Sequence, residues 1–354
     1  MPVRNPRPPG DAATRPAAMC AAAALRPTEP LPLPSGLSLS PRLKLLLTFF
    51  RADLTVRPLD EWQLKSALLA FLRDPPLSLP ILPDSDLSVR RLPDLQKRRR
   101  EEPVASGVLH VRDLSFLRPR KGDGEAEGMA PEQEEAKYFE WRSSLVKKLE
   151  GIELNLEGVK FRMTVEIPPS DDFRAMKKSW EDFYSSELLN SRNPVRKIAK
   201  RPDTVIVRGV PSRWFAETRV SSKPSTLVTH TIFSALGKIR TLNIANDDEL
   251  EAKEDAANKE LVSGLNCKVW VQFESYDDFQ DAMKALCGRS LEKEGSRLKV
   301  DYDVSWDREG FFRIAQYEPS RSNIGEKDAS ATVHGRKKHY SSRIESDHRK
   351  RFRD

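Results

Sequence analysis

Two short runs of alternating apolar residues constrain the fold of this chain more than any other feature. One extends from Thr204 to Val210 and the other from Asn266 to Phe273, and both are rich in β-branched and aromatic residues. An apolar side chain at every second position is typical of a strand that buries one face. We therefore predict a strand over each run.

The residues around these two strands predict four more elements within residues 202–305. A helix ends before Gly237, a strand covers Ile239 to Ile244, a second helix begins after Ser275, and a last strand covers Leu298 to Val304. The resulting β-α-β-β-α-β order is ferredoxin-like, with both helices on one face of the sheet.

Residues 41–170 repeat this order less clearly. A strand over Leu43 to Phe50 leads to a helix with Asp60 as its N-cap, and a second helix covers Tyr138 to Leu149. We predict a degenerate copy of the same domain, and the alternative is an α/β domain specific to its own family. The predicted fold class is therefore α+β, with tandem ferredoxin-like domains.

Three segments lie outside these two domains. Residues 1–40 are rich in Pro and Ala and lack periodicity, so we expect a disordered tail. Residues 171–201 begin with aromatic residues at helical spacing and end in basic residues, which predicts an amphipathic helix and a basic linker. Residues 306–354 are mostly polar and basic, and we expect a second tail that is mostly disordered.

Charge is unevenly distributed along the chain. The formal net charge is +7, yet residues 203–305 contain fourteen Lys and Arg against seventeen Asp and Glu. Basic residues thus flank the clearest domain, and this pattern is compatible with a nucleic-acid partner.

Several classes of protein are disfavoured by composition. Three cysteines without a CxxC pair and five scattered histidines provide no metal-ligand spacing, so we expect no metal and no other cofactor. We find no Gly-rich phosphate loop and no nucleophile elbow, and the longest apolar run is too short to span a membrane. We therefore expect neither an enzyme nor a membrane protein.

The strands predicted from Thr204 to Val210 and from Asn266 to Phe273 resemble the ribonucleoprotein strands of an RNA recognition motif. The sheet of that motif stacks RNA bases on exposed aromatic residues. Of the three positions that are usually aromatic, only Trp270 is aromatic here, so the resemblance implies weak binding of single-stranded RNA. The alternative is that Trp270 is covered by a helix or tail, or contacts another protein. By strand alternation, the candidate RNA-binding residues are Ile206, Arg208, Lys268, Trp270, Gln272 and Lys299.

A second resemblance concerns Arg201-Pro202-Asp203-Thr204 and the segment from Gly209 to Phe215. These residues resemble the A-kinase anchor protein 17A-like family, which is splicing-associated. The resemblance implies a nuclear protein that binds RNA or splicing factors. The member that gives the family its name also anchors protein kinase A through amphipathic helices beyond the recognition domain, and the sequence to Asp354 contains neither those helices nor an Arg/Ser-rich tail. Binding to the kinase regulatory subunit is therefore doubtful, and we assign no anchoring residue.

Taken together, these patterns predict a nuclear RNA-binding protein that regulates pre-mRNA splicing. The alternative is a protein-interaction scaffold, with a spliceosomal or kinase partner and little RNA affinity of its own. The basic runs at residues 97–100, 336–338 and 349–351 are nuclear-import signals, RNA contacts or solvated loops.

Overall fold

The computed structural model describes residues 26–52, 59–75, 77, 79, 83–92, 102–117, 130–190, 201–217, 223–246 and 265–313. The chain divides into two compact units, Met1–Glu309 and Gly310–Asp354, and every element below belongs to the first unit. The three basic runs and most of the predicted C-terminal tail lie outside the described residues.

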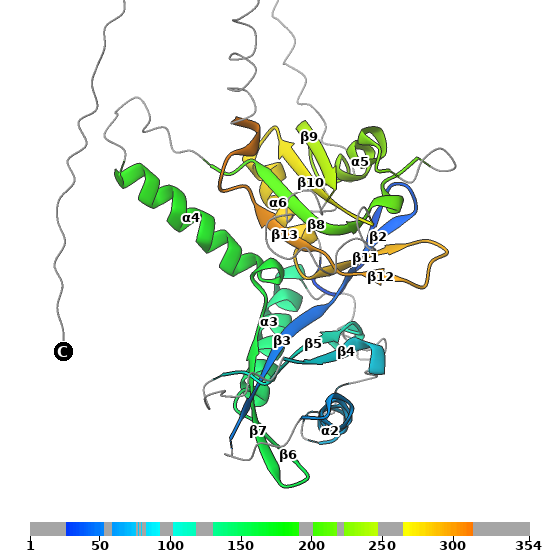
Figure 1. Cartoon of the computed structure of the whole chain (residues 1–354). Helices are drawn as coiled ribbons and strands as arrows, with labels where there is room; N and C mark the ends of the chain where they lie inside the picture. Colours follow the sequence, from blue (N-terminus) through cyan, green and yellow to red (C-terminus); the bar gives the residue numbers. More distant parts are fainter. Residues whose placement is uncertain are drawn as a thin grey trace, which may run out of the picture. The chain divides into compact units, whose positions relative to one another are not determined.

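Sheet B is built from the first half of the chain and has five antiparallel strands in the order β4-β5-β3-β7-β6 (Figure 1). Leucines at alternate positions of β3 pack with Leu64 and Leu68 of α2 and Leu145 of α3 in one core. Asp60 caps α2 by accepting a hydrogen bond from the Trp62 amide at 2.9 Å. The elements are β3 (Leu43–Arg51), α2 (Glu61–Arg73), β4 (Leu87–Arg91), β5 (Ala105–Val111), α3 (Pro131–Leu149), β6 (Glu153–Leu156) and β7 (Val159–Glu166), with the 3-10 turns η1 (Asp84–Asp86) and η2 (Ser115–Leu117).

Sheet C is built from the second half and has four antiparallel strands in the order β13-β8-β10-β9. The Ser275 hydroxyl caps α6 by accepting from the Asp278 amide at 3.0 Å, as the sequence predicts. Phe279 and Met283 of α6 are buried against Val269 and Val271 of β10. The elements are β8 (Thr204–Pro211), η5 (Ser212–Trp214), α5 (Thr226–Phe233), β9 (Ile239–Asn246), β10 (Asn266–Phe273), α6 (Tyr276–Leu286) and β13 (Asp303–Trp306).

The two sheets share one order of connection. In each, the first and third strands are central, the second strand lies beside the third, and the last strand lies beside the first. In sheet B, β6 is an additional strand at the edge next to β7. The structure is therefore mixed α and β with several antiparallel sheets, compatible with RNA recognition motif-like domains.

Sheet A joins the N-terminus to the second half of the chain. Its order is β1-β2-β11-β12, with β1 (Leu31–Leu33), β2 (Leu37–Pro41), β11 (Arg289–Lys293) and β12 (Lys299–Val300). Leu31, Leu33, Leu37 and Leu39 are buried in the core that also contains the strands of sheet C. The prediction of a disordered tail over residues 1–40 is therefore wrong for residues 31–40.

The last strand of residues 202–305 was predicted as one element over Leu298 to Val304, which is wrong. The structure has two short strands there, β12 in sheet A and β13 in sheet C. β12 pairs with β11, whereas β13 pairs with β8, and Asp301 between them contacts residues from the first half of the chain.

Helix α4 (Phe173–Asn190) follows the 3-10 turn η3 (Pro169–Asp171) and lies in the range where an amphipathic helix is predicted, while most of the predicted basic linker lies outside the described residues. Met176 and Trp180 are buried in the core of the second half, and the Trp180 ring lies 5.3 Å from that of Phe279 in an edge-to-face arrangement. The N-terminal part of α4 therefore belongs to that core and is more than a connection.

Candidate nucleic-acid interface

The centre of the sheet C face that was predicted to be open is buried. Trp270 is only 4% exposed. Its paired residue on β8, Ile206, is also buried, and so is Gln272. These three side chains were predicted to point away from the helices. The strand register agrees, because Val205, Val207 and Val269 at the alternate positions pack with the helices on the other side of the sheet. The prediction that Ile206, Trp270 and Gln272 present an open stacking surface is wrong, because alternation defines the side of a strand and not what covers it.

Gln272 also has an internal partner. Its Nε2 donates to Oδ2 of Asp203 at 2.9 Å. This bond occupies one of the two N–H donors of the amide, so only the other N–H and the carbonyl oxygen remain for another partner.

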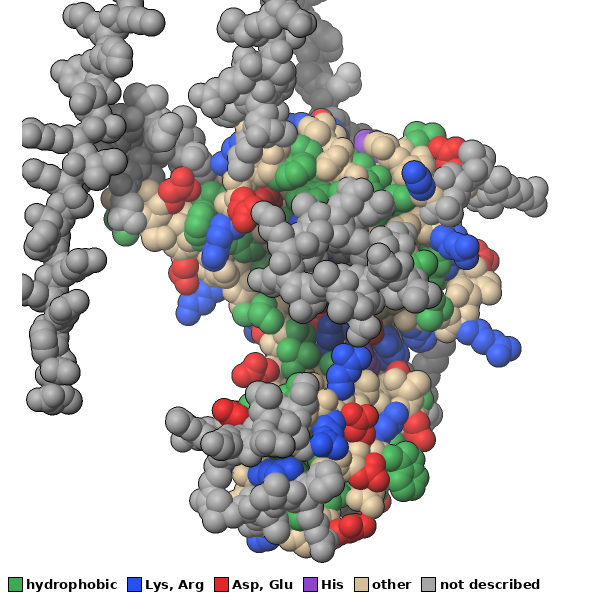
Figure 2. Space-filling view, in the orientation of Figure 1, with side chains coloured by type: hydrophobic (Ala, Val, Ile, Leu, Met, Phe, Trp, Pro, Cys, Tyr) green, Lys and Arg blue, Asp and Glu red, His purple; other side chains and the backbone are tan. Residues whose placement is uncertain are grey.

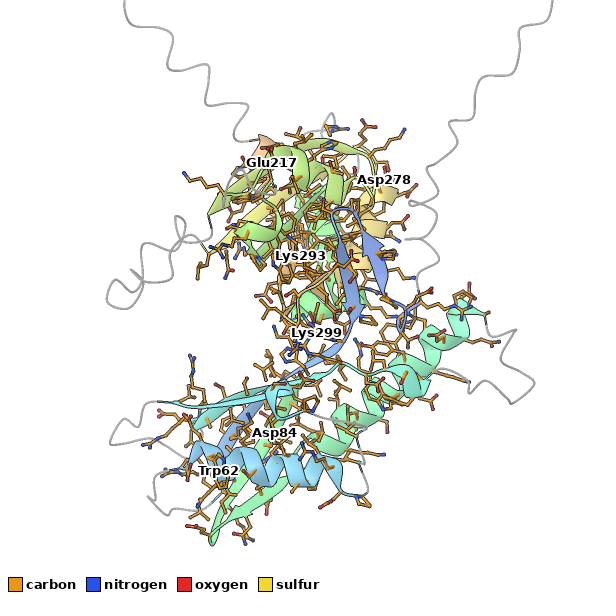
Figure 3. The ribbon with its side chains drawn as sticks, turned by 90° about the vertical axis from the view of Figure 1, so that its right-hand side faces the viewer. Trp62, Asp84, Glu217, Asp278, Lys293 and Lys299 are labelled. Atoms are coloured by element: carbon orange, nitrogen blue, oxygen red, sulfur yellow. The ribbon has the colours of Figure 1, made fainter. Side chains whose placement is uncertain are left out.

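The cations of the predicted site lie in different places. Arg208 is exposed on β8, opposite Asp303 of β13, and Lys268 is half-buried with its ammonium 4.4 Å from the centroid of the Trp270 ring. Lys299 belongs to the β11–β12 hairpin (Figure 3), where its Nζ lies 2.9 Å from Oε1 of Glu292. Sheet C thus brings Arg208 and Lys268 to one end of its face and leaves Lys299 on another sheet.

This arrangement favours contact with phosphates over stacking of bases. Arg208 is available to an anion, whereas the only aromatic residue of the predicted set is buried. Phosphate contacts position a nucleic acid without reading its sequence.

Sequence reasoning missed a cluster of charges at Asp301. Its carboxylate lies 2.7 Å from Nε of Arg42, 3.0 Å from Nη2 of Arg112 and 3.1 Å from Nε2 of His110. Arg42 is fully buried between β2 and β3 and also pairs with Asp171, while its amide donates to the carbonyl oxygen of Gly288 at 2.9 Å. Burial alone would raise the pKa of Asp301, but the contact with His110 and the charge of Arg42 hold that pKa well below its usual range.

The Asp301 cluster leads to a prediction about stability and pH. Replacing Asp301 with asparagine is expected to lower the free energy of unfolding by about 1–3 kcal/mol at pH 7, because Arg42 and Arg112 each lose one of their two carboxylate partners. The folded-state pKa is below the unfolded value of about 3.9, so the carboxylate stabilises the fold above about pH 4 and this contribution is lost as the pH falls further. Urea unfolding at pH 7 and pH 3 measures both effects.

The matched control is Asp303→Asn. The Asp303 side chain is 69% exposed and lies 3.7 Å from Nζ of Lys44, so its replacement is expected to change stability by less than about 1 kcal/mol. An equal loss in both variants at pH 7, or a loss in Asp301→Asn that is unchanged at pH 3, would contradict the role assigned to Asp301.

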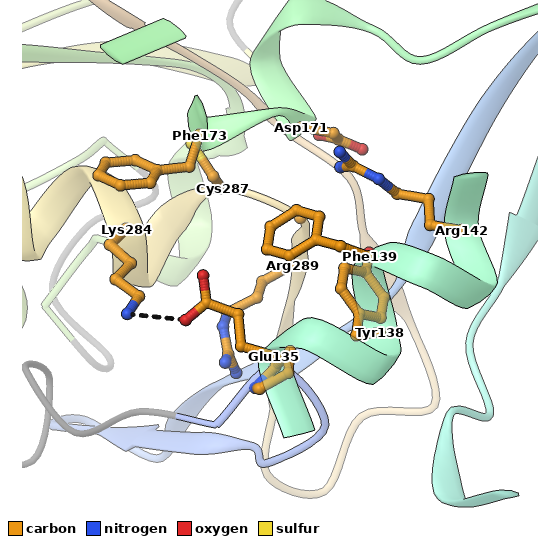
Figure 4. Close-up of a pocket in the computed structure, with 11 residues that line it drawn as sticks. Glu135, Tyr138, Phe139, Arg142, Asp171, Phe173, Lys284, Cys287 and Arg289 are labelled. Atoms are coloured by element: carbon orange, nitrogen blue, oxygen red, sulfur yellow. Dashed lines mark hydrogen bonds and ion pairs between the residues drawn. The ribbon is translucent and has the colours of Figure 1, made fainter. Parts of the chain in front are cut away.

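A small pocket lies between α3 and α6 (Figure 4). Tyr138 and Phe139 line it from α3, and Lys284 reaches Glu135 across it at 3.4 Å. Its volume is about 80 Å³, whereas ligand pockets usually enclose about 300–1,000 Å³. We therefore assign no ligand to this pocket.

Within the described ranges, no group of three or more His, Cys, Asp or Glu side chains is arranged to hold a metal ion. No helix in the same part of the chain is both long and apolar enough to cross a membrane.

Comparison with known proteins relates this chain to an RNA-binding family. The family model described as "AKAP-17A-like, RNA-binding domain" matches residues 133–351. A-kinase anchor protein 17A from Homo sapiens is 29% identical over 176 residues, which cover 46% of this chain and 25% of that protein. The chain thus spans about a quarter of the length of this relative. The matched range includes all of sheet C but begins after β3, β4 and β5.

Proposed function

Because the chain belongs to the family of AKAP-17A-like RNA-binding domains, we propose that it binds single-stranded RNA through two RNA recognition motif-like domains. The observation that carries this proposal is the family match over residues 133–351, which includes every strand of sheet C. The order β13-β8-β10-β9 supports it, and the same order in sheet B supports the second domain.

Weak affinity for RNA follows from the geometry of sheet C. Stacking on an aromatic residue contributes about 1–3 kcal/mol per base, and Trp270 is buried. Arg208 and Lys268 therefore contribute mainly through charge. A nuclear role in the regulation of pre-mRNA splicing is part of this proposal, and it rests on the family relationship.

Replacing Arg208 with glutamate tests the contribution of sheet C. We expect weaker binding of a fluorescently labelled single-stranded RNA by the full chain, because the phosphates are then repelled. The slope of log affinity against log salt concentration is expected to fall in magnitude by about 0.7 for one lost phosphate contact. Fluorescence anisotropy at several salt concentrations measures both quantities.

Lys178→Glu is the matched control. It makes the same change of charge at an exposed position of α4, so a general loss of positive charge would weaken both variants equally. That outcome would argue against a specific contact at Arg208. Absence of RNA binding by the wild-type chain at about 50 mM salt would reject the proposed function itself.

The second candidate function is a protein-interaction scaffold. The burial of Ile206 and Trp270 favours it, since sheet C then offers little for a base to stack on. The relative's name, A-kinase anchor protein 17A, makes the regulatory subunit of protein kinase A one partner to test. Binding of that subunit by a chain that does not bind RNA would support this candidate over the first.

A further inference from the structure

Sheet C ends in a strand that has no partner on its outer side among the described strands. Strand β9 pairs with β10, and no other strand in the described part of the chain pairs with it (Figure 1). An edge strand presents a row of N–H and C=O groups that are directed away from its sheet. These groups form a template to which a further strand adds by hydrogen bonding.

β9 is longer than the other described edge strands and less protected. It has eight residues, whereas β1, β4, β6, β12 and β13 have two to five and each contains a proline or a charged residue. Short strands, charges, prolines and bulges are the features that protect sheet edges from pairing. In β9, Arg240 is the one charged residue, and it lies where the register against β10 shifts. The remaining stretch from Thr241 to Asn246 is regular and uncharged.

The side chains of β9 add apolar contact area to this edge. Leu242 and Ile244 pair with valines of β10 that face the helices, and both are half-buried. Asn243 lies between them and points to the opposite face of the sheet. Helix α5 packs beside β9 and carries Leu227, which is 70% exposed. Figure 2 shows hydrophobic side chains at the surface in the region where Figure 1 places β9 and α5.

The strand is complementary to a second copy of itself. Two antiparallel copies related by a two-fold axis at Asn243 place Leu242 of each copy opposite Ile244 of the other, on the helix side of both sheets. On the opposite face, Thr241 lies opposite Ala245 of the second copy. The two Asn243 side chains meet at the axis, where each amide both donates and accepts. A shift of the axis by one residue leaves one of the two apolar residues opposite a polar one.

The charges that flank β9 favour antiparallel association of two copies. Lys238 and Arg240 lie at its start and are exposed, whereas Asp247 and Asp248 follow it in the sequence. Antiparallel association brings the start of each strand to the end of the other, so opposite charges attract. Parallel association would bring like charges together. The partner that this edge fits best is therefore a second copy of this chain.

We propose that two copies of this chain associate through β9 and form one continuous sheet, to which sheet C of each copy contributes four strands, with a two-fold axis at Asn243. Pairing over so few residues is a small interface, and interfaces below about 1,200 Å² belong to weak complexes. We therefore expect a reversible dimer with a dissociation constant of about 10 µM. This association is independent of the proposed binding of RNA.

Sedimentation velocity of the full chain between about 1 µM and 100 µM tests the inference, and the wild type is expected to change from monomer to dimer over this range. Asn243→Lys is expected to raise the dissociation constant at least about tenfold, because two like charges meet at the axis. Asn243→Glu alone is expected to have the same effect. An equimolar mixture of the two variants is expected to restore the dimer, because opposite charges then meet.

Ser305→Lys is the matched control. Ser305 is half-buried, as Asn243 is, and lies at the other end of the same row of paired residues across sheet C. Its replacement introduces the same charge at the opposite edge of the sheet, so dimerisation is expected to stay within about twofold of the wild type. An equal loss in Asn243→Lys and Ser305→Lys would argue against an interface at β9.

Hydrogen exchange of the wild type tests the same strand without a substitution. It decides the matter if circular dichroism shows that either Asn243 variant is unfolded. Amides within Thr241–Asn246 are expected to exchange about fourfold more slowly at about 100 µM than at about 1 µM, because the dimer protects its outward N–H groups. The peptide that contains β13 is expected to exchange at the same rate at both concentrations.

The outcomes are decisive in both directions. A wild type that remains monomeric at about 100 µM overturns the inference and leaves this edge to an extended segment of another protein. A dimer that persists unchanged in both Asn243 variants, without protection of Thr241–Asn246, overturns it as well. Loss of the dimer in each variant alone and its return in the mixture supports the inference. None of these measurements involves RNA, so the proposed function is tested separately.

Discussion

Replacing Trp180 with alanine is expected to lower the free energy of unfolding by about 3–5 kcal/mol, because it leaves a cavity between α4 and α6. The side chain is 1% exposed, its ring lies 6.0 Å from Phe173 and 5.3 Å from Phe279, and its Nε1 donates to Oη of Tyr276 at 3.3 Å. Urea denaturation of the full chain, followed by circular dichroism, measures the loss.

The control lies on the same helix. Leu189 of α4 is 86% exposed, so Leu189→Ala is expected to change stability by no more than about 0.5 kcal/mol. A loss below about 1 kcal/mol in Trp180→Ala would contradict the placement of α4 in the core of the second half.

The second large effect concerns the N-terminal hairpin. Leu39→Ala is expected to cost about 2–5 kcal/mol, because this side chain is fully buried and its removal leaves a cavity. In the sheet, Leu39 pairs with Leu31 of β1 on one side and with Leu291 of β11 on the other. Its loss therefore acts on the core that sheet C shares.

Leu298→Ala is the matched leucine replacement. Leu298 precedes β12 and is mostly exposed, so little change in stability is expected. Thermal unfolding followed by circular dichroism compares the two variants. Equal melting temperatures for Leu39→Ala and the wild type would show that residues 31–41 are not part of this core.

The elements predicted best from sequence depend on local chemistry. Asp60 and Ser275 cap their helices as expected, because an N-cap side chain bonds to an amide two or three residues ahead. The strands at β3, β8 and β10 follow from alternation within the strand itself.

The elements missed from sequence depend on distant partners. Strand β2 pairs with β11, whose residues are some 250 positions later in the chain, and the Pro-rich composition of residues 1–40 hides its alternating leucines. The contacts of Asp301 with Arg42 and Arg112 likewise join residues that are far apart in the sequence. No local sequence pattern predicts the pairing of β2 with β11 or the contacts of Asp301.

The candidate site was predicted only in part for the same reason. Alternation correctly placed Trp270 on the side of β10 opposite to Val269 and Val271. The burial of Trp270 depends on tertiary contacts, and so does the position of Lys299 on sheet A. Alternation within one strand predicts neither of them.

Ultraviolet cross-linking of the full chain to a single-stranded RNA, followed by mass spectrometry of the cross-linked peptides, tests RNA binding most directly. We expect cross-links in peptides next to Arg208, because this exposed residue lies on the proposed contact surface of sheet C. Cross-linking no stronger than that of an unrelated protein of similar net charge would contradict the proposal that this chain binds RNA.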